Sequence, residues 1–585
     1  MTPEGGAVNG DQRDLLVVGA SIVDVVTQSV YRGWFTVVAG RFLEVEAGEA
    51  PADRHAAAKR VVDLGGAFVQ PGMLDIHMHI ESSLVTPRRF AEAVLPHGTT
   101  TILQDPHEVA NVLGAPGIRW MIDSSRGLPL RVYCAISSCV PATSAAIETP
   151  NASISPAEVS ELAREPDVIA LGEMMDFHGL IDGDEHLSAM LDAARAAGLS
   201  LEGHVPSLSG PELSRYIAYG IRSDHTLMTP AKLLEQLRKG MWVMIQEKSV
   251  TADVVDTIRQ LPDRSRVLLI TDDVMPNRLL TGHLDRVLTK AIDLGWDPLD
   301  ALASATLRPA SYLGLHDLGM IAPGAKADFV VTRAAATFPA TAVYVGGEQL
   351  VDNGRLIESI APPSVVTTPE GVLESFASGL FDPTSFHFTM SDGSARARVI
   401  VVNEVNSFTT LEEREVSFSG GRPTDSDITL ATVIPRAATR LGASPYAPVI
   451  CLVAGLGLQD GAYASSFAHD SHNVFVIGRD PEAMAAAFDA VMEVGGGMAF
   501  TSDADTAPTL LPLALAGLLS DDPVASVAAG FEAIEQGLRT AGVRVKNPVL
   551  LLTLLPLSVS PDYKVSDKGI VDVQGRRVLS PMVAK

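Results

Sequence analysis

The 585-residue chain contains little cysteine, little positive charge and no long apolar run. Its three cysteines, Cys134, Cys139 and Cys451, cannot all pair and form no CxxC motif, so we expect reduced thiols in a cytoplasmic protein. Lys and Arg number 44 against 70 Asp and Glu, and the net charge of −26 argues against nucleic-acid and anionic-membrane partners, which attract basic surfaces. The apolar stretch 548–559 is too short to cross a bilayer, so a buried strand or helix is expected there.

The chain does contain a long alternation of apolar strands and amphipathic helices. Amphipathic segments such as 155–165, 184–198 and 231–240 separate most of the strands. Parallel strands buried on both faces are nearly continuously apolar, as these are. The pattern predicts an α/β fold with a (β/α)8 TIM-like barrel. The eight expected strands are 72–79, 99–105, 131–138, 168–175, 199–204, 221–225, 241–249 and 266–273.

The two flanks of this region have a different pattern. Residues 14–48 and 318–355 are strand-like and interrupted by glycine turns, which is typical of short antiparallel strands. We therefore predict a small composite β-domain from residues 1–70 plus 319–365, flanking a barrel at 71–318. Residues 366–585 are expected to form an additional C-terminal α/β domain.

His77 and His79 end the first expected barrel strand. Residues two apart in a strand point to one side, so both imidazoles can face one metal ion, although a lone His-x-His pair is weak evidence. The later strands strengthen it, because active sites of such barrels lie at the C-terminal strand ends. Acids or histidines end seven of the eight strands, and the later ones are Asp105, Glu173, His204, Asp224/His225, Glu247 and Asp272/Asp273.

Four imidazoles and two carboxylates suit two borderline divalent ions such as Zn²⁺, Mn²⁺ or Fe²⁺. Glu173 would bridge the ions, which can lower the pKa of a bound water toward neutrality. Asp272 could take the proton of the attacking water and pass it to a leaving group. This chemistry suits hydrolysis at a trigonal carbon bearing nitrogen, in an amide, a cyclic amidine or an aminopurine. The candidate ligands are His77, His79, Glu173, His204, His225 and Asp272.

Each candidate also has a structural alternative. His204 could be a buried histidine bonded to backbone, Glu173 could pair with an arginine, and Asp272 or Asp273 could cap a helix. The segment DPHEVANVLG (105–114) would place Asp105, His107 and Glu108 on the rim of the site, but it is also a helix start. The segment AHDSHN (468–473) is equally compatible with a solvated loop and a functional one.

Together these segments resemble the bacterial adenine deaminases of the amidohydrolase superfamily. PGMLDIHMHIESS (71–83) is similar to the family's first-strand motif, and LPHGTTTILQDPHEVANVLG (95–114) is distinctive of adenine deaminases. GEMMDF, EGH, SDH and ITDD follow in the family order, and the C-terminal region matches through GAYASSFAHDSHNVFVIG, GGGMAF, LLPLALAGLLSD and SDKGIVDV.

The resemblance implies an amidohydrolase barrel that hydrolyses adenine to hypoxanthine and ammonia with a metal-activated hydroxide, in purine salvage or catabolism. It implies a divalent metal pair, usually Mn²⁺ or Fe²⁺, with Glu173 in place of the carboxylated lysine of many relatives and Asp272 as ligand and proton shuttle. Barrels of this kind commonly form homodimers or larger homo-oligomers. Residues expected to bind substrate or to support the ligands are Glu81, Ser82, Asp105, His107, Glu108, Asp273 and His472.

The chain departs from the family pattern at two places. Thr226 stands where the family usually has an acid, and Gln246-Glu247-Lys248-Ser249 replaces an Arg-Glu-Gly-Ser. These departures leave open a same-fold deaminase of a substituted adenine or another aminopurine, or a cyclic amidohydrolase. A catalytically dead metal-binding scaffold is the remaining alternative.

Overall fold

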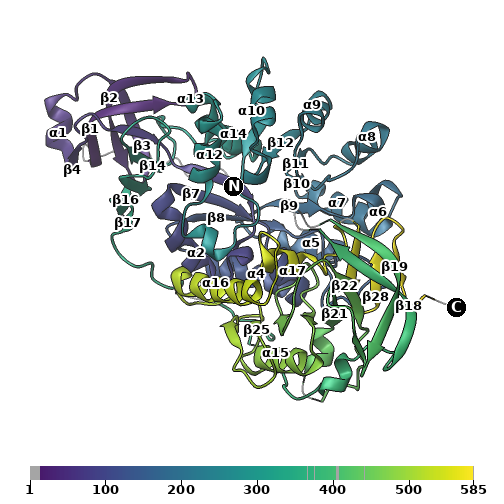
Figure 1. Cartoon of the computed structure of the whole chain (residues 1–585). Helices are drawn as coiled ribbons and strands as arrows, with labels where there is room; N and C mark the ends of the chain where they lie inside the picture. Colours follow the sequence, from purple (N-terminus) through teal and green to yellow (C-terminus); the bar gives the residue numbers. More distant parts are fainter. Residues whose placement is uncertain are drawn as a thin grey trace.

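The computed structural model describes residues 13–364, 366–373, 376–403, 408–440, 442–560 and 562–583 (Figure 1). Its centre is eight parallel strands, and each lies within a segment expected from the sequence. They are β6 (Met73–Met78), β7 (Thr99–Gln104), β8 (Arg131–Ile136), β9 (Val168–Met174), β10 (Ser200–Gly203), β11 (Ser223–Asp224), β12 (Trp242–Ile245) and β13 (Val267–Leu269).

The eight strands form two hydrogen-bonded sheets, where one continuous barrel was expected. One sheet has the order β10-β9-β8-β7-β6 and the other the order β11-β12-β13. Strands β10 and β11 are not joined by a backbone ladder, and β11 has only two residues. A side chain connects them instead, since the Gly203 N–H donates to Ser223 Oγ at 3.0 Å. At the other junction, between β6 and the residues that follow β13, the Asp272 N–H donates to the His77 backbone oxygen at 3.1 Å.

Helices follow most of these strands, as the amphipathic segments predict. Helix α5 begins with a capping box, in which Ser155 and Glu158 satisfy each other's backbone N–H groups. The helices of this region are α2 (Pro87–Val94), α3 (His107–Leu113), α4 (Ala115–Ser125), α5 (Pro156–Leu162), α6 (Phe177–Ile181), α7 (Glu185–Ala196), α8 (Gly210–Ala218), α9 (Pro230–Arg238), α10 (Ala252–Arg259), α11 (Pro276–Leu279), α12 (Leu284–Asp293), α13 (Pro298–Ser304) and α14 (Leu307–Tyr312).

A separate nine-stranded sheet joins segments from before and after the eight parallel strands. Its order is β17-β16-β15-β14-β5-β1-β2-β3, with β4 paired to β1. Phe35, Phe42 and Phe329 pack in its core with ring centroids 5.1–6.0 Å apart. The strands are β1 (Arg13–Asp24), β2 (Ser29–Val38), β3 (Arg41–Ala47), β4 (Ala58–Asp63), β5 (Phe68–Pro71), β14 (Phe329–Thr332), β15 (Ala342–Val345), β16 (Glu348–Asp352) and β17 (Arg355–Leu356), with helix α1 (Ala52–Ala57) between β3 and β4.

The C-terminal region contains a second nine-stranded sheet, in the order β20-β19-β18-β22-β21-β24-β23-β25-β26. Its strands are β18 (Gly393–Val402), β19 (Thr409–Ser419), β20 (Arg422–Pro423), β21 (Ile428–Ile434), β22 (Cys451–Ala454), β23 (Ala462–Ser465), β24 (Val474–Gly478), β25 (Gly497–Thr501) and β26 (Thr509–Pro512). The remaining α-helices and β-strands are α15 (Pro481–Glu493), α16 (Val524–Thr540), α17 (Pro548–Leu554), β27 (Tyr563–Ser566), β28 (Gly569–Asp572) and β29 (Arg577–Leu579).

The apolar stretch near the C-terminus forms the buried helix α17, one of the two forms expected for it. In the described part of the chain, no helix combines the length and apolarity needed to span a membrane. The eight parallel strands and their helices, from β6 to α14, are called the strand-and-helix region below. The largest apolar core contains side chains of both this region and the C-terminal region, among them Ile80, Leu84, Phe467 and Leu552. This shared core brings the C-terminal region against the strand ends.

Candidate metal centre

His79 follows the end of β6, and hydrogen bonding fixes how its ring is presented. Its Nδ1 lies 2.9 Å from the backbone oxygen of Asp105, so this nitrogen carries the proton that the oxygen accepts. Nε2 then has a free lone pair, 3.5 Å from Glu173 Oε1 and 3.6 Å from Asp272 Oδ1. Histidines that bind metals are usually oriented in this way through the second ring nitrogen.

Glu173, near the end of β9, is where the later imidazoles meet. His204 Nδ1 lies 2.6 Å from Glu173 Oε2, and His225 Nε2 lies 3.1 Å from the same oxygen. Burial would raise the pKa of the Glu173 carboxyl, but the neighbouring His225 and His204 outweigh it and hold that pKa well below 4.5. Glu173 is therefore an anion surrounded by imidazoles.

His77 contributes a buried nitrogen without a hydrogen-bond partner. Its ring stacks on His225 with centroids 3.7 Å apart, and its Nε2 has no hydrogen-bond partner among the described residues. Burial, with His225 beside it, holds the pKa of His77 well below 6.5, so the ring is neutral. Leaving such a lone pair unused is costly, and a metal ion would use it. Ligand atoms within 4.8 Å of one another come from His77, His79 and Asp272, and from His77, Glu173 and His225.

Asp272 follows β13 with a left-handed backbone, φ 62°. Aspartate tolerates this conformation better than most residues, and such strain is found at functional sites more often than elsewhere. The next residue, Asp273, accepts a hydrogen bond from the Ser82 hydroxyl. Both aspartates thus face the end of β6, and the helix-cap alternative does not describe them.

Asp105 holds the backbone that carries Glu173. One carboxylate oxygen accepts the Ser137 hydroxyl at 2.6 Å, and the other accepts the Glu173 N–H at 3.1 Å. A side chain at Gly172 would place its Cβ 1.9 Å from Asp105 Oδ2, so this close approach requires glycine. Asp105 therefore positions Glu173 through its side chain and contacts His79 through its backbone oxygen.

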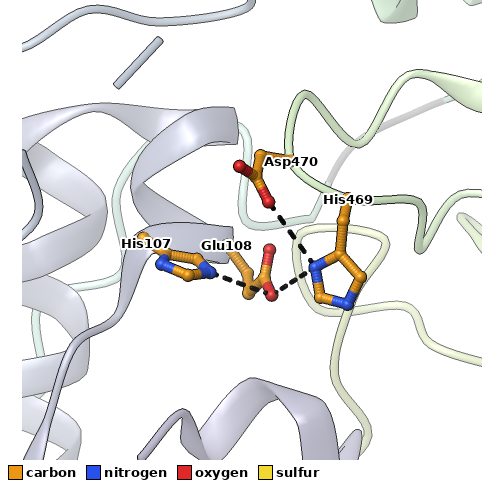
Figure 2. A group of neighbouring side chains, drawn as sticks. All are labelled: His107, Glu108, His469 and Asp470. Carbon is orange, nitrogen blue, oxygen red and sulfur yellow. Dashed lines mark ion pairs between the residues drawn. The ribbon is translucent and has the colours of Figure 1, made fainter. Parts of the chain in front are cut away.

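His107, Glu108, His469 and Asp470 form a second buried polar group, which we call the outer cluster (Figure 2). His107 and Glu108 begin α3, and the other two come from the segment between β23 and β24. His472, from the same segment, is fully buried and contacts Glu108 Oε2. The AHDSHN segment is thus packed against α3 and is not a solvated loop. His107 Nδ1 lies 3.3 Å from Glu173 Oε1, so the outer cluster adjoins the centre around Glu173.

Glu81 is buried beside the start of α3. One of its oxygens accepts the Val109 N–H at 3.4 Å, and the other has no hydrogen-bond partner in the part of the chain that the structure describes. Burial and the neighbouring charge of Glu108 raise the pKa of Glu81 to about 7. Its nearest described partner is therefore α3, rather than the imidazoles around Glu173.

The departures from the family pattern have defined positions. The Thr226 hydroxyl donates to Asp224 Oδ1 at 2.9 Å. The Gln246 side-chain amide donates to the His225 backbone oxygen at 3.0 Å, which holds that histidine in place. Gln246 is therefore bonded to His225 itself, and Thr226 to the residue that precedes His225.

Glu247 was expected among the strand-end acids, and the structure places it in a different environment. Strand β12 ends at Ile245, and Glu247 pairs with Arg278 at 2.8 Å and with Arg286 at 3.3 Å. The expected strand 241–249 was too long, because a short 3-10 turn begins at Glu247. This acid belongs to an ion-pair group at the rim.

A cavity of about 330 Å³ adjoins these residues. Gln246, Lys248 and Asp273 line it from the side of the parallel strands, and Phe531 and Asn547 line it from the C-terminal region. The cavity therefore reaches one of the two adjacent aspartates that follow β13.

The prediction from sequence included His472 but not His469 or Asp470. All three side chains are buried against α3 or its neighbours. The signal was present in the same hexapeptide, but nothing in the local pattern shows that a segment some 360 residues after α3 packs against it.

Buried histidines and carboxylates at the ends of parallel strands are the arrangement of an amidohydrolase, and residues 68–350 match the model of the amidohydrolase family. Residues 406–577 match the adenine deaminase C-terminal domain. The chain belongs to the adenine deaminase family.

Three relatives that match this chain nearly end to end support the family assignment. "Adenine deaminase" of Methanothermobacter thermautotrophicus is 38% identical, over 92% of this chain and 98% of that protein. "Adenine deaminase" of Desulfatibacillum aliphaticivorans is 35% identical, over 96% and 95%. "Adenine deaminase 2" of Rhizobium meliloti is 35% identical, over 99% and 96%.

Proposed function

We propose that this protein hydrolyses adenine to hypoxanthine and ammonia at the centre around Glu173. The observation that carries the proposal is that the imidazoles and carboxylates at the strand ends converge, in a chain whose end-to-end relatives are named adenine deaminases. The reaction breaks the C6–N bond of the amino group, forms a C6–O bond and transfers protons from water to the departing nitrogen.

We propose two divalent ions, Mn²⁺ or Fe²⁺ with Zn²⁺ as the alternative, as the cofactor. The unpartnered His77 Nε2 and the free Nε2 of His79 fit this role, because both lone pairs are buried beside carboxylates. Such ions lower the pKa of a coordinated water toward neutrality and so supply the nucleophile. The proposed ligands are His77, His79, Glu173, His204, His225 and Asp272.

Asp272 is the proposed proton carrier. The Asp272 carboxylate lies 3.6 Å from His79 Nε2, where it can accept the proton of the attacking water and return it to the amino group as ammonia leaves. Asp105 and Gln246 would act at a distance, by holding the backbones of Glu173 and His225.

The purine ring is proposed to lie toward the cavity that Asp273 lines. A carboxylate oxygen accepts hydrogen bonds from a ring N–H, and the Ser82 hydroxyl fixes the orientation of Asp273. Gln246 and Lys248 on the same wall provide polar groups that can contact the base.

The finer architecture and setting are also proposals. We propose that the two parallel sheets together form a (β/α)8 barrel at 71–318, flanked by a composite β-domain (1–70 plus 319–365) and a C-terminal domain (366–585). The protein is proposed to act in the cytoplasm as a homodimer or larger homo-oligomer. Analytical ultracentrifugation would test the assembly, and a monomer at micromolar concentration would contradict it.

The test of the proposed function is adenine turnover by purified protein loaded with Mn²⁺. Ammonia release and the absorbance change from adenine to hypoxanthine should proceed at equal rates. Asp272→Asn is the matched variant, and it should lose turnover because an amide cannot accept the proton. Equal turnover by both proteins would contradict the role of Asp272.

A deaminase of a substituted adenine or another aminopurine is the second candidate. Gln246 and Lys248 favour it, because they line the cavity where the family pattern has an arginine and a glycine. A panel of adenine, N6-substituted adenines and 2-aminopurine separates the two. Turnover of another base with none of adenine would replace the leading proposal.

A further inference from the structure

The outer cluster lies between two parts of the chain that are far apart in sequence. His107 and Glu108 belong to the first turn of α3, and His469 and Asp470 belong to the segment between β23 and β24. All four residues are at most 4% exposed. Figure 2 shows their nitrogen and oxygen atoms pointing toward one another.

These atoms lie close enough together to share one cation, because one ligand atom of each residue lies within 4.8 Å of the others. Glu108 Oε1 lies 3.2 Å from His107 Nε2 and 2.7 Å from His469 Nδ1, and His469 Nδ1 lies 3.7 Å from Asp470 Oδ1. Within the described ranges, Glu108 Oε1 nevertheless has no partner of acceptable hydrogen-bond geometry. Ligand atoms that each lie about 2.0–2.2 Å from one ion are separated by roughly 3–3.5 Å.

Other polar atoms of the outer cluster also lack partners. His469 Nε2 and Asp470 Oδ2 are buried and make no hydrogen bond in the described structure. Burying a polar atom without a partner costs about 1–3 kcal/mol, and buried carboxylates are normally paired or bound to a metal. The four residues carry two carboxylates and no lysine or arginine, so a divalent cation would balance their charge.

Neighbouring groups orient the atoms that would bind the ion. The Ala468 N–H donates to His472 Nδ1 at 3.1 Å, so the proton of that ring is on Nε2. His472 Nε2–H can then donate to Glu108 Oε2, which leaves Oε1 directed at His107 and His469. His107 Nδ1 faces Glu173, which leaves its Nε2 for the ion. Metal ligands are characteristically held by outer hydrogen bonds such as the one between His472 and Glu108.

We propose that His107, Glu108, His469 and Asp470 bind a further divalent transition-metal ion, separate from the centre around Glu173. Two imidazole nitrogens and two carboxylate oxygens suit Mn²⁺, Fe²⁺ or Zn²⁺. The ion would connect α3 to the C-terminal region and hold the AHDSHN segment over the strand ends. This site goes beyond the proposed function, which needs only the residues at the strand ends.

The test is a count of bound metal that does not depend on activity. The purified full chain is loaded with Mn²⁺, freed of excess ions and analysed by mass spectrometry for metal per chain. Asp470→Asn and His469→Ala should each bind one equivalent less than the wild type. His186→Ala, at an exposed position, is the matched control and should bind the full amount. Equal metal content in the wild type and both cluster variants would overturn the proposal.

Anomalous diffraction at the manganese edge provides the second measurement and uses the unaltered protein. A peak between His107 Nε2 and Glu108 Oε1 is expected, in addition to any peak beside Glu173. Absence of that peak in crystals that show density beside Glu173 would overturn the outer site and leave the proposed function intact. Absence beside Glu173 alone would contradict the proposed function and leave the outer site intact.

Discussion

At the scale of single residues, the negative charge of Glu173 is what keeps four imidazoles close together. Its oxygens lie 2.6–3.5 Å from nitrogens of His79, His107, His204 and His225. Glu173→Gln preserves the shape of the side chain but removes its charge, so we expect loss of metal. Turnover should fall by more than about 100-fold, which is more than the loss of a hydrogen bond to a metal ligand usually costs. Metal content and adenine turnover measure both effects.

The control for this variant is its circular dichroism spectrum. The centre lies at strand ends while the apolar core lies elsewhere, so the spectrum of Glu173→Gln should match the wild type. Full metal content with near-normal turnover would contradict the bridging role of Glu173.

The local pattern predicts the residues that the structure brings together around Glu173, and it includes His107 and Glu108 of the outer cluster but not His469 or Asp470. His77 and His79 could be found because strand alternation sends both to one side. Glu173 and His225 could be found because parallel strands end at one edge. Asp470 could not, because its contact with α3 depends on long-range packing that no local periodicity encodes.

At the scale of elements, β9 can present Glu173 only if its backbone approaches Asp105 closely. The Cβ of an alanine at Gly172 would lie 1.9 Å from Asp105 Oδ2, so Gly172→Ala must displace that carboxylate. We expect a stability loss of about 1–3 kcal/mol, from overpacking. A displacement near 1 Å at Glu173 can lower turnover by about 100-fold. Thermal unfolding and turnover provide the two measurements.

Asp105→Ala supplies the companion to this variant, because it removes the oxygen that the new Cβ would meet. The double variant Gly172→Ala/Asp105→Ala should be less destabilised than the sum of the two single variants. If the stability losses of the two single variants simply add in the double variant, the clash between the new Cβ and Asp105 is not the cause of the loss.

The loop between β8 and α5 contains Glu148, which is 4% exposed and accepts the Thr143 hydroxyl at 2.6 Å. Burial raises its pKa from 4.5 to about 7. Between those pH values the folded chain holds a proton that the unfolded chain has lost, so the free energy of unfolding falls as pH rises. Glu148→Gln should therefore be more stable than the wild type at pH 8, by up to about 3 kcal/mol.

The difference in stability should disappear as pH falls below about 4.5, because both states of the wild type then hold the proton. Thermal unfolding from pH 4.5 to 8 measures this profile. Glu161→Gln, whose side chain is 60% exposed in the wild type, is the matched control. The same pH profile for both variants would contradict an effect of burial at Glu148.

Most strands were predictable as elements because buried parallel strands are continuously apolar. The pairing of the strands was not predictable in the same way. The junction of β10 with β11 depends on the hydrogen bond to Ser223 Oγ, and a side-chain bond of this kind leaves no mark on the hydrophobic pattern. The end of β12 was misplaced for a similar reason, because Glu247 is held by arginines from outside its own strand.

At the scale of the whole molecule, the C-terminal region completes the main core. Ser520 pairs with the segment after β6 through two backbone hydrogen bonds. The Ser520 N–H donates to the Leu84 oxygen at 2.9 Å, and the Thr86 N–H donates to the Ser520 oxygen at 3.1 Å. Figure 1 shows α16 beside α2, and the two helices are in contact. The strand-and-helix region therefore depends on the C-terminal region for burial of Ile80, Leu84 and their neighbours.

A chain that ends at residue 365 should consequently fail to fold into a soluble monomer. It would expose apolar side chains that are each worth about 1.5–3 kcal/mol when buried, and it would lose His469 and Asp470 beside α3. Co-expression of residues 1–365 with 366–585 is the control, because it restores the interface without the covalent link. We expect aggregation of the short chain alone and a soluble, metal-binding complex of the two fragments. A soluble, cooperatively unfolding 1–365 chain with full adenine turnover would show that the strand ends function without the C-terminal region.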